Sequence, residues 1–448
     1  MAQRTRVLIL GGGFAGVQTA MELERLFPDG AQVEITLVSR DNFVLFTPML
    51  HEVAASDLDI TTIVNPIRKM LRHAQFIAAD VESIDLQTKQ VTVAHGLHRH
   101  EHVLTYDHLV LALGSVTNFY GLDGLEDRAL TMKSLEDAIR LRNKMISHLE
   151  EADPHCASAS RSALLTLVVA GGGFAGVETV AGVYDFMHSA LRSYPNLKSE
   201  MLRIVLVHPG HYLLPELGEK LGRYTQAKLS KRGIEVHIGV KVTSISSEGL
   251  VLSDGNFIPT MFVVWTAGTS PSRHVASLPC ENRGGRVTTG RTLAVKGREG
   301  VWALGDCASI PDGDGGFYPP TAQHALRQAK TVARNIAASI RGTPAEEFSF
   351  ATIGQLAAIG RRVGVARVFG LQFSGFLAWW MWRTIYLIKL PRWEKRLHVA
   401  LDWTLDLIFS KDTVQYVSFR AQGHSLPPAP AISDATSGAS PQIRSERS

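Results

Sequence analysis

The residues with the clearest chemical meaning form a glycine-rich segment that occurs twice in the chain. Residues 11–17 read GGGFAGV, and residues 171–177 repeat the same letters. Each copy follows a short apolar run, typical of a buried strand, and precedes a segment with helical character. In this context the motif binds the pyrophosphate of a dinucleotide, because the N–H groups and the dipole at the helix N-terminus favour an anion. The repeat therefore predicts two dinucleotide sites rather than two glycine-rich turns that bind nothing.

Three glycines in each copy have separate structural tasks. The first permits the tight turn out of the strand, the second lets the backbone approach the pyrophosphate, and the third lets the helix pack closely on the strand. These glycines are Gly11, Gly13 and Gly16 in the first copy and Gly171, Gly173 and Gly176 in the second. A second strand-like run follows each helix, at 33–38 and 203–207, so each copy belongs to a strand–helix–strand unit.

Three further strands end in glycine, at Gly114, Gly268 and Gly305, where a side chain would intrude on a bound nucleotide. Their positions predict a first domain in two parts, with a second dinucleotide domain inserted between them. The division predicted from the sequence is a first domain at 1–117 and 290–345, a linker at 118–160 with a helix at 134–151, a second domain at 161–289, a C-terminal region at 346–420 and a disordered tail at 421–448.

Composition excludes several other classes of protein. The chain has 448 residues, enough for about three domains, and its net charge of +4 argues against a dedicated nucleic-acid binder. Its three cysteines, Cys156, Cys280 and Cys307, are far apart, which argues against a disulfide scaffold, a CxxC pair or a thiolate zinc site. The alternating histidines of a predicted hairpin, His95, His98, His100 and His102, favour a solvated turn over a metal site.

Together the motifs resemble the two-dinucleotide-binding flavoproteins, and within that superfamily the type II NADH:quinone oxidoreductases. The resemblance covers about residues 1–420. It rests on the order and spacing of GGGFAG at 11–16, NFVLFTPML at 42–50, YDHLVLALGS at 106–115, GGGFAGVE at 171–178, WTAG at 265–268, ALGD at 303–306 and PPTAQHA at 319–325. It implies an α/β fold with two Rossmann-like domains, similar to glutathione reductase, and a C-terminal amphipathic helical segment that binds the membrane.

The resemblance also implies the activity and the residues that hold the cofactors. FAD occupies the first site non-covalently and NADH the second; a hydride passes from NADH to FAD, and two electrons then pass to a membrane quinone without proton pumping. The implied cofactor-binding residues are Gly11, Gly13, Phe14, Ala15, Gly16, Ser39, Arg40, Thr47, Pro48, Gly114, Gly171, Gly173, Phe174, Gly176, His208, Gly268, Gly305, Asp306, Ala322 and Gln323. Asp306 would bond the ribityl chain of FAD; its alternative role is a helix N-cap.

Two residues carry the implied catalytic roles. Glu178 stands where the first glycine unit has Gln18, and the family places this acid between nicotinamide and flavin. Its alternative role is electrostatic, since an acid early in a helix is stabilised by about 0.3–1 kcal/mol. Gln323 matches the first of two glutamines that the family places four residues apart at the quinone end of the flavin; its alternative role is a polar residue at a helix start.

Three positions depart from the family pattern. The acid that grips the adenosine ribose is Ser39 in the first unit and His208 in the second. A histidine, unlike an acid, does not repel the 2′-phosphate of NADPH, so the sequence leaves the choice between NADH and NADPH open. Arg203 lies too early in its strand to bind that phosphate. The second quinone-site glutamine is replaced by Arg327, with Gln328 one place late, which leaves the type of quinone open.

Missing cysteines separate the chain from some relatives. Disulfide reductases of this superfamily need a CxxxxC near the first glycine loop, and the chain has none there. Cys307 is expected to be a small buried apolar residue. Two other functions remain as alternatives: a soluble reductase of a ferredoxin- or rubredoxin-like protein, and a redox sensor that binds FAD and NADH but turns over slowly.

The C-terminal region has the composition of a membrane interface. Residues 379–403 contain Trp379, Trp380, Trp382, Trp393 and Trp403, together with several lysines and arginines. Such rings lie at the depth of lipid headgroups, and the cations favour anionic lipid. A packed helical pair or a dimer interface is the alternative. The most apolar stretch, 368–390, is interrupted by Arg383 and Lys389, which disfavours a spanning helix. We therefore expect a peripheral protein on the cytoplasmic face of the inner membrane, and the sequence leaves a homodimer open.

Overall fold

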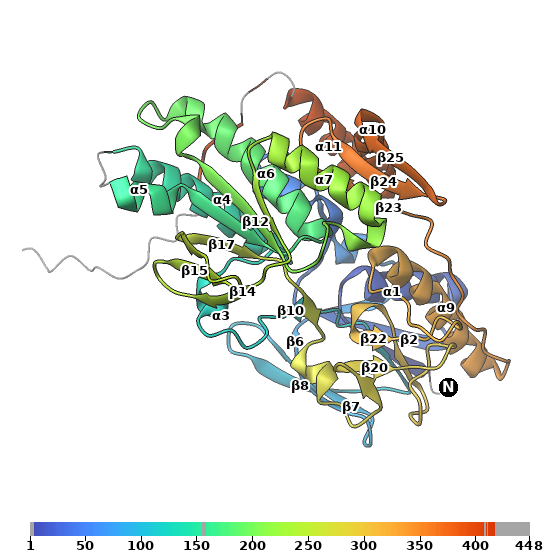
Figure 1. The fold of residues 1–448 in the computed structure, drawn as a ribbon. Helices are drawn as coiled ribbons and strands as arrows, with labels where there is room; N and C mark the ends of the chain where they lie inside the picture. The colour runs from blue at the N-terminus through green and yellow to red at the C-terminus, as the bar shows by residue number, and fades with distance from the viewer. Residues whose placement is uncertain (1–3, 155–157, 407–408, 410, 417–448) are drawn as a thin grey trace, which may run out of the picture.

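Two parallel sheets, each flanked by helices, form the body of the protein (Figure 1). The structure is a computed structural model that describes residues 4–154, 158–406, 409 and 411–416. Cys156 and the predicted tail at 421–448 lie outside the described residues. The two sheets belong to two Rossmann-like units, which is the fold class expected from the glycine repeat.

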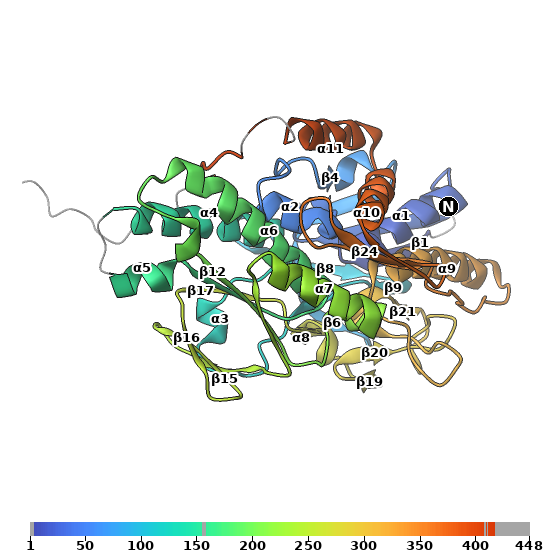
Figure 2. The same ribbon diagram turned by 45° about the horizontal axis from the view of Figure 1, so that its top comes forward.

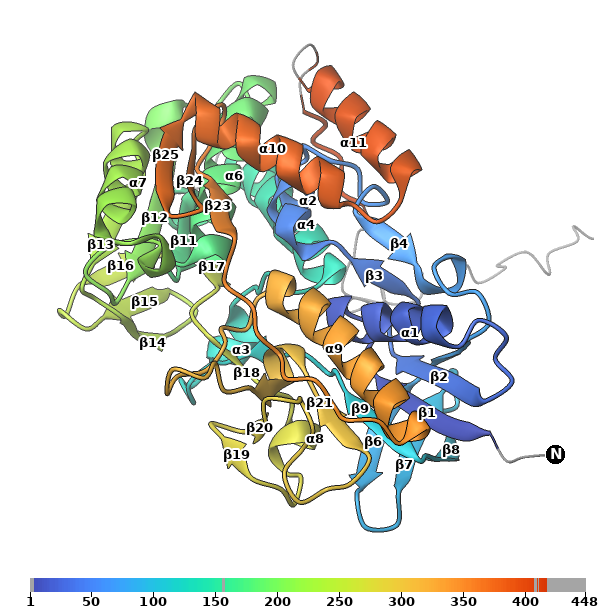
Figure 3. The same ribbon diagram turned by 90° about the vertical axis from the view of Figure 1, so that its right-hand side faces the viewer.

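The first sheet unites distant parts of the chain. In spatial order its strands are β21 (Val301–Ala303), β9 (His108–Leu111), β1 (Thr5–Leu10), β2 (Val33–Ser39) and β5 (Gln75–Ala78), all parallel. Its central strands are buried on both faces, which is why their sequences are nearly continuous apolar runs. Helices α1 (Phe14–Leu26) and α9 (Ala322–Arg341) pack side by side on one face (Figure 3).

The second sheet repeats this arrangement. Its parallel strands, in order, are β13 (Glu235–Ile238), β12 (Arg203–His208), β11 (Thr166–Ala170) and β17 (Phe262–Trp265). Helix α6 (Phe174–Ala190) follows its glycine loop as α1 follows the first. Helix α4 (Leu135–Ala152) agrees with the predicted helix at 134–151 and begins with a capping box formed by Ser134 and Asp137.

Smaller elements join and extend the two units. Strands β10 (Val116–Thr117) and β18 (Thr269–Ser270) pair antiparallel and form the connection between the units. The other elements are β3 (Phe43–Leu45), α2 (Leu50–Ala54), β4 (Val64–Pro66), β6 (Asp80–Asp85), β7 (Gln90–His95), β8 (His100–Thr105), α3 (Leu125–Arg128), α5 (Ser158–Leu164), α7 (Glu219–Lys231), β14 (Val242–Ile245), β15 (Gly249–Leu252), β16 (Phe257–Pro259), α8 (Arg273–Ala276), β19 (Asn282–Arg283), β20 (Arg286–Thr288) and β22 (Ala308–Ser309).

The histidine-rich hairpin is formed by β7 and β8, as predicted. His95 and His102 stack with ring centroids 4.6 Å apart, and their Nε2 atoms are 2.6 Å apart, so one imidazole hydrogen-bonds the other. Within the part of the chain that the structure describes, no group of three or more histidine, cysteine, aspartate or glutamate side chains is arranged to hold a metal ion.

The C-terminal region differs from the expected run of amphipathic helices. It begins with an antiparallel sheet of β23 (Gly354–Ala358), β24 (Gly364–Val368) and β25 (Leu371–Gly375). Only then do α10 (Phe376–Lys389) and α11 (Trp393–Leu405) follow, lying across the body beside α2 (Figure 2). Among the helices that the structure describes, none combines the length and the apolar character that crossing a bilayer requires.

Two of the tryptophans assigned to the membrane interface are instead buried in the core. Trp382 is 0% exposed and Trp403 is 7% exposed. Both indoles face the body of the protein, where their N–H groups donate hydrogen bonds to buried carboxyl groups. The membrane assignment of these two residues is therefore wrong, whereas Trp380 and Trp393 are exposed at 53% and 69%.

Candidate active site

The first glycine loop has the shape that a dinucleotide requires. Gly11 adopts φ +114°, and a Cβ on it would lie 2.2 Å from the carbonyl oxygen of Ala112. A Cβ on Gly16 would lie 1.9 Å from the oxygen of Gly11, so the third glycine permits the contact between helix and loop. Around Gly13, in contrast, no atom lies within 4 Å of such a Cβ. Gly13 caps α1 without a side-chain hydrogen bond, which leaves N–H groups free for an anion.

The second loop has the same backbone geometry at its three glycines. Gly171 has φ +121°, and a Cβ on Gly176 would lie 1.8 Å from its oxygen. Gly173 again faces open space and caps α6 without a side-chain bond. Two loops with one backbone geometry fit two dinucleotides. Phe174 and Phe14 occupy the same first position of their helices.

The strand-end positions explain what replaces the usual acids. Ser39 lies against Gly12, where an added Cβ would be 2.5 Å from the serine Oγ. His208 Nδ1 accepts a hydrogen bond of 3.1 Å from the N–H of Gly172, and burial lowers the pKa of His208, so the ring is neutral there. Arg40 is exposed and pairs with Asp41 at 3.6 Å.

Arg203 is bonded away from the second loop. Its Nε and Nη2 atoms each lie 2.9 Å from a carboxylate oxygen of Glu235. It therefore gives the second site no cation for a 2′-phosphate, as its early position in the strand led us to expect.

Asp306 stands in a polar network beside the first loop. Its Oδ2 accepts a hydrogen bond of 2.8 Å from Ser115 Oγ, which in turn accepts one of 2.7 Å from Lys133 Nζ. Arg286 Nε donates to the Asp306 carbonyl oxygen at 3.0 Å. The residue lies in a short 3-10 helix at Gly305–Cys307 whose N-cap is Leu304, so the alternative N-cap role of Asp306 is wrong. Ser115 ends the motif at 106–115 and Lys133 lies outside any motif, and the network that they form with Asp306 joins residues far apart in the sequence, which is why the sequence did not predict it.

Gly305 brings the start of α9 to the same place. An added Cβ would lie 3.4 Å from the Cβ of Ala15 and 3.8 Å from that of Ala325. The N–H of Gly305 donates to Gln328 Oε1 at 2.9 Å, so Gln328 holds this turn instead of replacing the second quinone-site glutamine. Cys307, next in the chain, is fully buried, as predicted.

Gly114 and Gly268 also lie at strand ends, with φ +65° and +103°. Gly268 is crowded: an added Cβ would lie 2.1 Å from the hydroxyl oxygen of Tyr120. Gly114 faces open space instead. The glycine at 268 therefore permits a protein contact, and the one at 114 leaves room for a ligand.

Glu178 is buried in the second turn of α6, immediately beyond the second glycine loop. Its Oε1 accepts hydrogen bonds from the N–H of Ala358 at 3.1 Å and from Trp382 Nε1 at 3.0 Å. Its Oε2 lies 3.7 Å from His51 Nδ1. Burial raises the pKa of Glu178 to about 8, and burial lowers the pKa of His51 to about 4. Near neutral pH the carboxyl is mainly protonated and the imidazole is neutral.

A series of aromatic rings connects this carboxyl with the first glycine loop. Phe14, at the start of α1, meets Phe46 with centroids 5.9 Å apart; Phe46 meets Tyr386 at 6.1 Å, and Tyr386 meets Trp382 at 5.0 Å. Thr47 and Pro48 follow Phe46 directly, in a 3-10 turn with Thr47 exposed and Pro48 half-buried. The segment at 46–48 thus lies between the first loop and the carboxyl, where the resemblance puts Thr47 and Pro48 at the cofactor.

The start of α9 carries the residues predicted for the quinone side. Ala322 is its first residue, and Gln323 Nε2 donates to the oxygen of Gly354 at 3.3 Å. Arg327 Nη1 donates to the oxygen of Gln323 at 2.9 Å, and its guanidinium lies 4.0 Å from the ring centroid of Phe350. Gln323 therefore touches the C-terminal sheet, and Arg327 folds back along its own helix.

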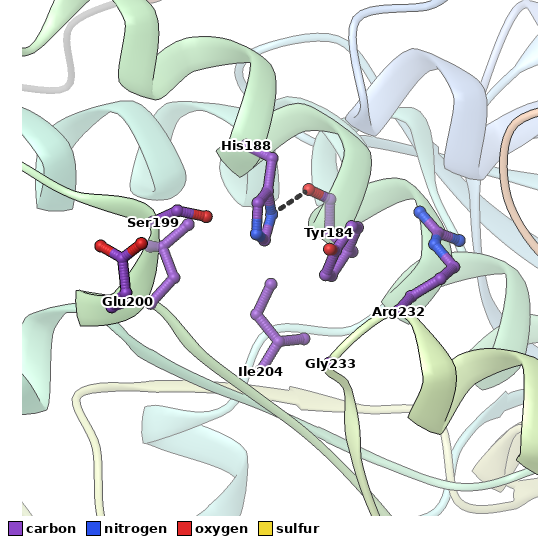
Figure 4. A pocket seen from close by; sticks show the side chains of 8 residues that line it. Tyr184, His188, Ser199, Glu200, Ile204, Arg232 and Gly233 are labelled. Atoms are coloured by element: carbon purple, nitrogen blue, oxygen red, sulfur yellow. Dashed lines mark hydrogen bonds between the residues drawn. The ribbon is translucent and has the colours of Figure 1, made fainter.

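A surface hollow lies elsewhere on the second unit. It has a volume of about 230 Å³ and is lined by Tyr184, His188, Ser199, Glu200, Leu202, Ile204, Arg232 and Gly233 (Figure 4). It lies near the C-terminal end of α6 and the start of β12, whereas nucleotides bind at the carboxyl ends of parallel strands. None of the predicted site residues lines it, so it is separate from the candidate site.

Sequence reasoning missed His51, Glu52 and the inward role of two tryptophans. Glu52 is buried on α2 and accepts a hydrogen bond of 3.0 Å from Trp403 Nε1. Burial raises its pKa to about 8. The segment LHEVA at 50–54 carries no motif, and the contact with Trp403 spans most of the chain, so only the fold shows the pair.

Comparison with known proteins gives the family. Residues 5–329 match the pyridine nucleotide-disulphide oxidoreductase family, and residues 349–412 match the NDH2 C-terminal domain. The type II NADH:quinone oxidoreductase Ndh of Mycobacterium tuberculosis is 32% identical, with 91% of this chain and 89% of that protein covered. Demethylphylloquinone reductase NdbB of Synechocystis is 32% identical, with 89% and 96% covered.

The solved structures give the same fold. NDH2 of Plasmodium falciparum in complex with NADH has a TM-score of 0.86 over 92% of this chain and 100% of that one, at 19% identity. A sulfide:quinone oxidoreductase of Aquifex aeolicus has a TM-score of 0.68 at 20% identity. With both parts of the chain matched and relatives aligned over nearly their whole length, the chain belongs to the type II NADH:quinone oxidoreductases, which pass electrons from NADH through a flavin to a quinone.

Proposed function

We propose that the glycine loop at 11–16 holds FAD, that the loop at 171–176 holds NADH, and that Glu178 and Gln323 serve the reaction between them and a membrane quinone. The observation that carries this proposal is the buried Glu178 carboxyl, which follows the second loop and lies at the end of the aromatic series from the first. When bound, FAD accepts a hydride from NADH and passes two electrons to a quinone. The proposed domains are those expected from the sequence, with FAD at 1–117 and 290–345 and NADH at 161–289.

The residues of the chain position and protonate the reactants. Free N–H groups at the starts of α1 and α6 bind the two pyrophosphates, and Asp306, held by Ser115, is placed for a ribityl hydroxyl. Reduction of a quinone by NADH consumes one proton from solution. Because burial keeps Glu178 mainly protonated near neutral pH, its carboxyl is suited to hold that proton.

The second site is proposed to prefer NADH by a modest margin. His208 is neutral and bonded to the loop, so it neither repels nor attracts a 2′-phosphate strongly. Arg203 is bound by Glu235. We expect NADH to reduce the flavin faster than NADPH by a factor on the order of ten.

Anaerobic rapid mixing of the purified, FAD-loaded protein tests the reaction. NADH, or NADPH in a second run, should bleach the flavin absorbance, and a short-chain quinone should then restore it. Bleaching without recovery would contradict the assignment of the quinone and favour a protein acceptor or a sensor. Equal rates with the two nucleotides would contradict the proposed preference.

Replacing Gln323 with tryptophan should separate the two half-reactions. The larger side chain at the start of α9 would occupy space between that helix and Gly354, where Gln323 now lies. We expect the quinone step to slow at least tenfold and the NADH step to stay within about twofold. Single-turnover rates of both steps measure this. Equal loss of both would place Gln323 outside the quinone site.

We further propose that α10 and α11 attach the protein to the cytoplasmic face of the inner membrane, where NADH is available. These helices expose Phe376, Leu377, Trp380, Ile388, Trp393, Leu397, Leu401 and Leu405. On α11 these residues recur every four positions, at 393, 397, 401 and 405, so they share one face of the helix, and an exposed apolar face of this kind marks a membrane or protein contact. Lys389, exposed beside it, suits anionic headgroups.

The double substitution Leu397→Glu and Leu401→Glu should release the protein from vesicles that contain anionic lipid. Each exposed leucine contributes about 1.5–3 kcal/mol when it leaves water, so we expect at least a tenfold weaker association by vesicle sedimentation. Leu97→Glu, at the fully exposed tip of the β7–β8 hairpin, is the matched control. Unchanged vesicle binding with a change of oligomeric state would instead assign this surface to a homodimer.

A further inference from the structure

Two indole N–H groups from the C-terminal helices end on buried carboxyl groups of the body. Trp382 of α10 donates to Glu178 Oε1, and Trp403 of α11 donates to Glu52 Oε2, each at 3.0 Å. All four side chains are buried. An indole nitrogen can only donate, so each contact fixes the oxygen that it reaches as an acceptor.

Both donors to Glu178 come from the C-terminal region. Oε1 takes the N–H of Ala358 on β23 as well as the indole of Trp382, while Oε2 faces His51 at 3.7 Å. The His51 ring packs against Trp382 with centroids 5.5 Å apart. The C-terminal region thus supplies both hydrogen bonds to Oε1, whereas Oε2 points toward His51 on α2. Without β23 and α10 it would have no donor on Oε1.

The charged groups around Glu178 act on it in opposite directions. Burial raises the pKa of Glu178 most, the hydrogen bonds from Ala358 and Trp382 lower it, and the nearby charge of Glu52 raises it. On α10, burial and, after it, the nearby charge of Glu178 raise the pKa of the Tyr386 phenol. From α2, His51 is neutral at physiological pH because burial lowers its pKa to about 4.

Glu52 has its own set of neighbours. Burial raises the pKa of Glu52 most, and the charge of Asp57 also raises it. The cations of Arg383 and Lys411 and the indole of Trp403 lower it. Arg383 itself is held over the rings of Trp379 and Trp403. A change at Trp403 would therefore reach Glu178 through Glu52, and also through the ring of Trp382, whose centroid lies 6.5 Å from that of Trp403.

We infer that Trp382 is a positioning residue for Glu178, so that the C-terminal helices, besides binding the membrane, set the pH range in which the active site delivers its proton. This inference rests on the proposed role of Glu178 in the quinone step. It adds a task for α10 that membrane attachment does not require, because Trp382 points away from the exposed face.

The test compares the pH dependence of the quinone step in FAD-loaded wild type and variants. Glu178→Gln identifies the midpoint of the pH profile that belongs to this carboxyl, because the amide cannot titrate. Trp382→Phe keeps a ring but removes the donor, and it should move that midpoint up by about half to one pH unit. Trp403→Phe is the matched control: it makes Glu52 less charged, so the midpoint should stay or move down. Infrared titration of the protonated carboxyl band, assigned by its loss in Glu178→Gln, should show the same shifts without turnover.

The outcomes separate the inference from the function on which it rests. If Glu178→Gln leaves the profile of the wild type unchanged, the proposed role of Glu178 is wrong. If the Glu178 midpoint exists but Trp382→Phe does not move it, the role stands and the inference is wrong. Should Trp382→Phe fail to hold FAD, benzothienylalanine at position 382 keeps the shape of the indole without its N–H, and an unmoved midpoint in that protein overturns the inference.

Discussion

Replacement of Gly176 with alanine is expected to give a protein that keeps FAD but no longer reduces it with NADH. A Cβ there would lie 1.8 Å from the carbonyl oxygen of Gly171, so α6 must move away from its loop. Such overpacking costs about 1–3 kcal/mol and displaces the N–H groups that bind the pyrophosphate. We expect NADH-dependent bleaching of the flavin to fall at least tenfold, as measured by anaerobic rapid mixing, with the flavin content unchanged.

The same substitution at Gly16 should remove FAD instead. The added Cβ would lie 1.9 Å from the oxygen of Gly11, in the loop that we assign to FAD. Gly173→Ala is the control for packing: its Cβ meets no protein atom within 4 Å, so it should leave the fold intact and weaken NADH only by crowding the bound nucleotide. Loss of FAD from Gly176→Ala, or of the NADH response alone from Gly16→Ala, would contradict the assignment of the two loops.

The loops were predictable because their signal is local. Three glycines within six residues, placed between an apolar run and a helix, fix a turn whose geometry depends on atoms close in sequence. Gly11 and Gly171 accordingly have nearly the same φ, +114° and +121°. The strand ends at Gly114, Gly268 and Gly305 follow from the same kind of local pattern.

The tryptophans show where local signals fail. Trp380 and Trp382 are two residues apart in one aromatic helix, yet the first is 53% exposed and the second 0%. Composition cannot distinguish them, because Trp382 is buried against residues distant in the sequence, among them Glu178, which lies about two hundred residues earlier. The same holds for Ser115, which bonds Asp306 from the connection between β9 and β10. The three-stranded sheet at 354–375 was missed because its strands are rich in alanine and glycine and alternate only weakly.

Replacing either buried carboxyl with its amide should make the protein more stable at alkaline pH. Glu178 and Glu52 have pKa values of about 8 in the folded protein against 4.5 for an ordinary glutamate. Below pH 4.5 both states are protonated, and the folded state loses nothing. Between 4.5 and 8 the unfolded chain releases protons that the folded protein retains, so wild-type stability falls as pH rises.

The expected gain above pH 8 is roughly 3–5 kcal/mol for one carboxyl. Denaturant unfolding of FAD-loaded wild type, Glu178→Gln and Glu52→Gln at pH 5 and pH 9 measures it. Unfolding curves of wild type and variants that change in parallel with pH would show that these carboxyls are already ionised in the folded protein.

The activity of the same variants then distinguishes a structural carboxyl from a functional one. If Glu178 only filled space and held α10, the amide would gain stability at alkaline pH and preserve quinone turnover. If it holds the proton for quinone reduction, Glu178→Gln gains stability at alkaline pH and loses the quinone step, because the amide cannot release a proton. Glu52→Gln should gain stability and keep turnover. The midpoint of its pH–turnover profile should move down, because removing the Glu52 charge lowers the pKa of Glu178. Opposite effects of one substitution on stability and turnover would thus assign chemistry to Glu178 and tuning to Glu52.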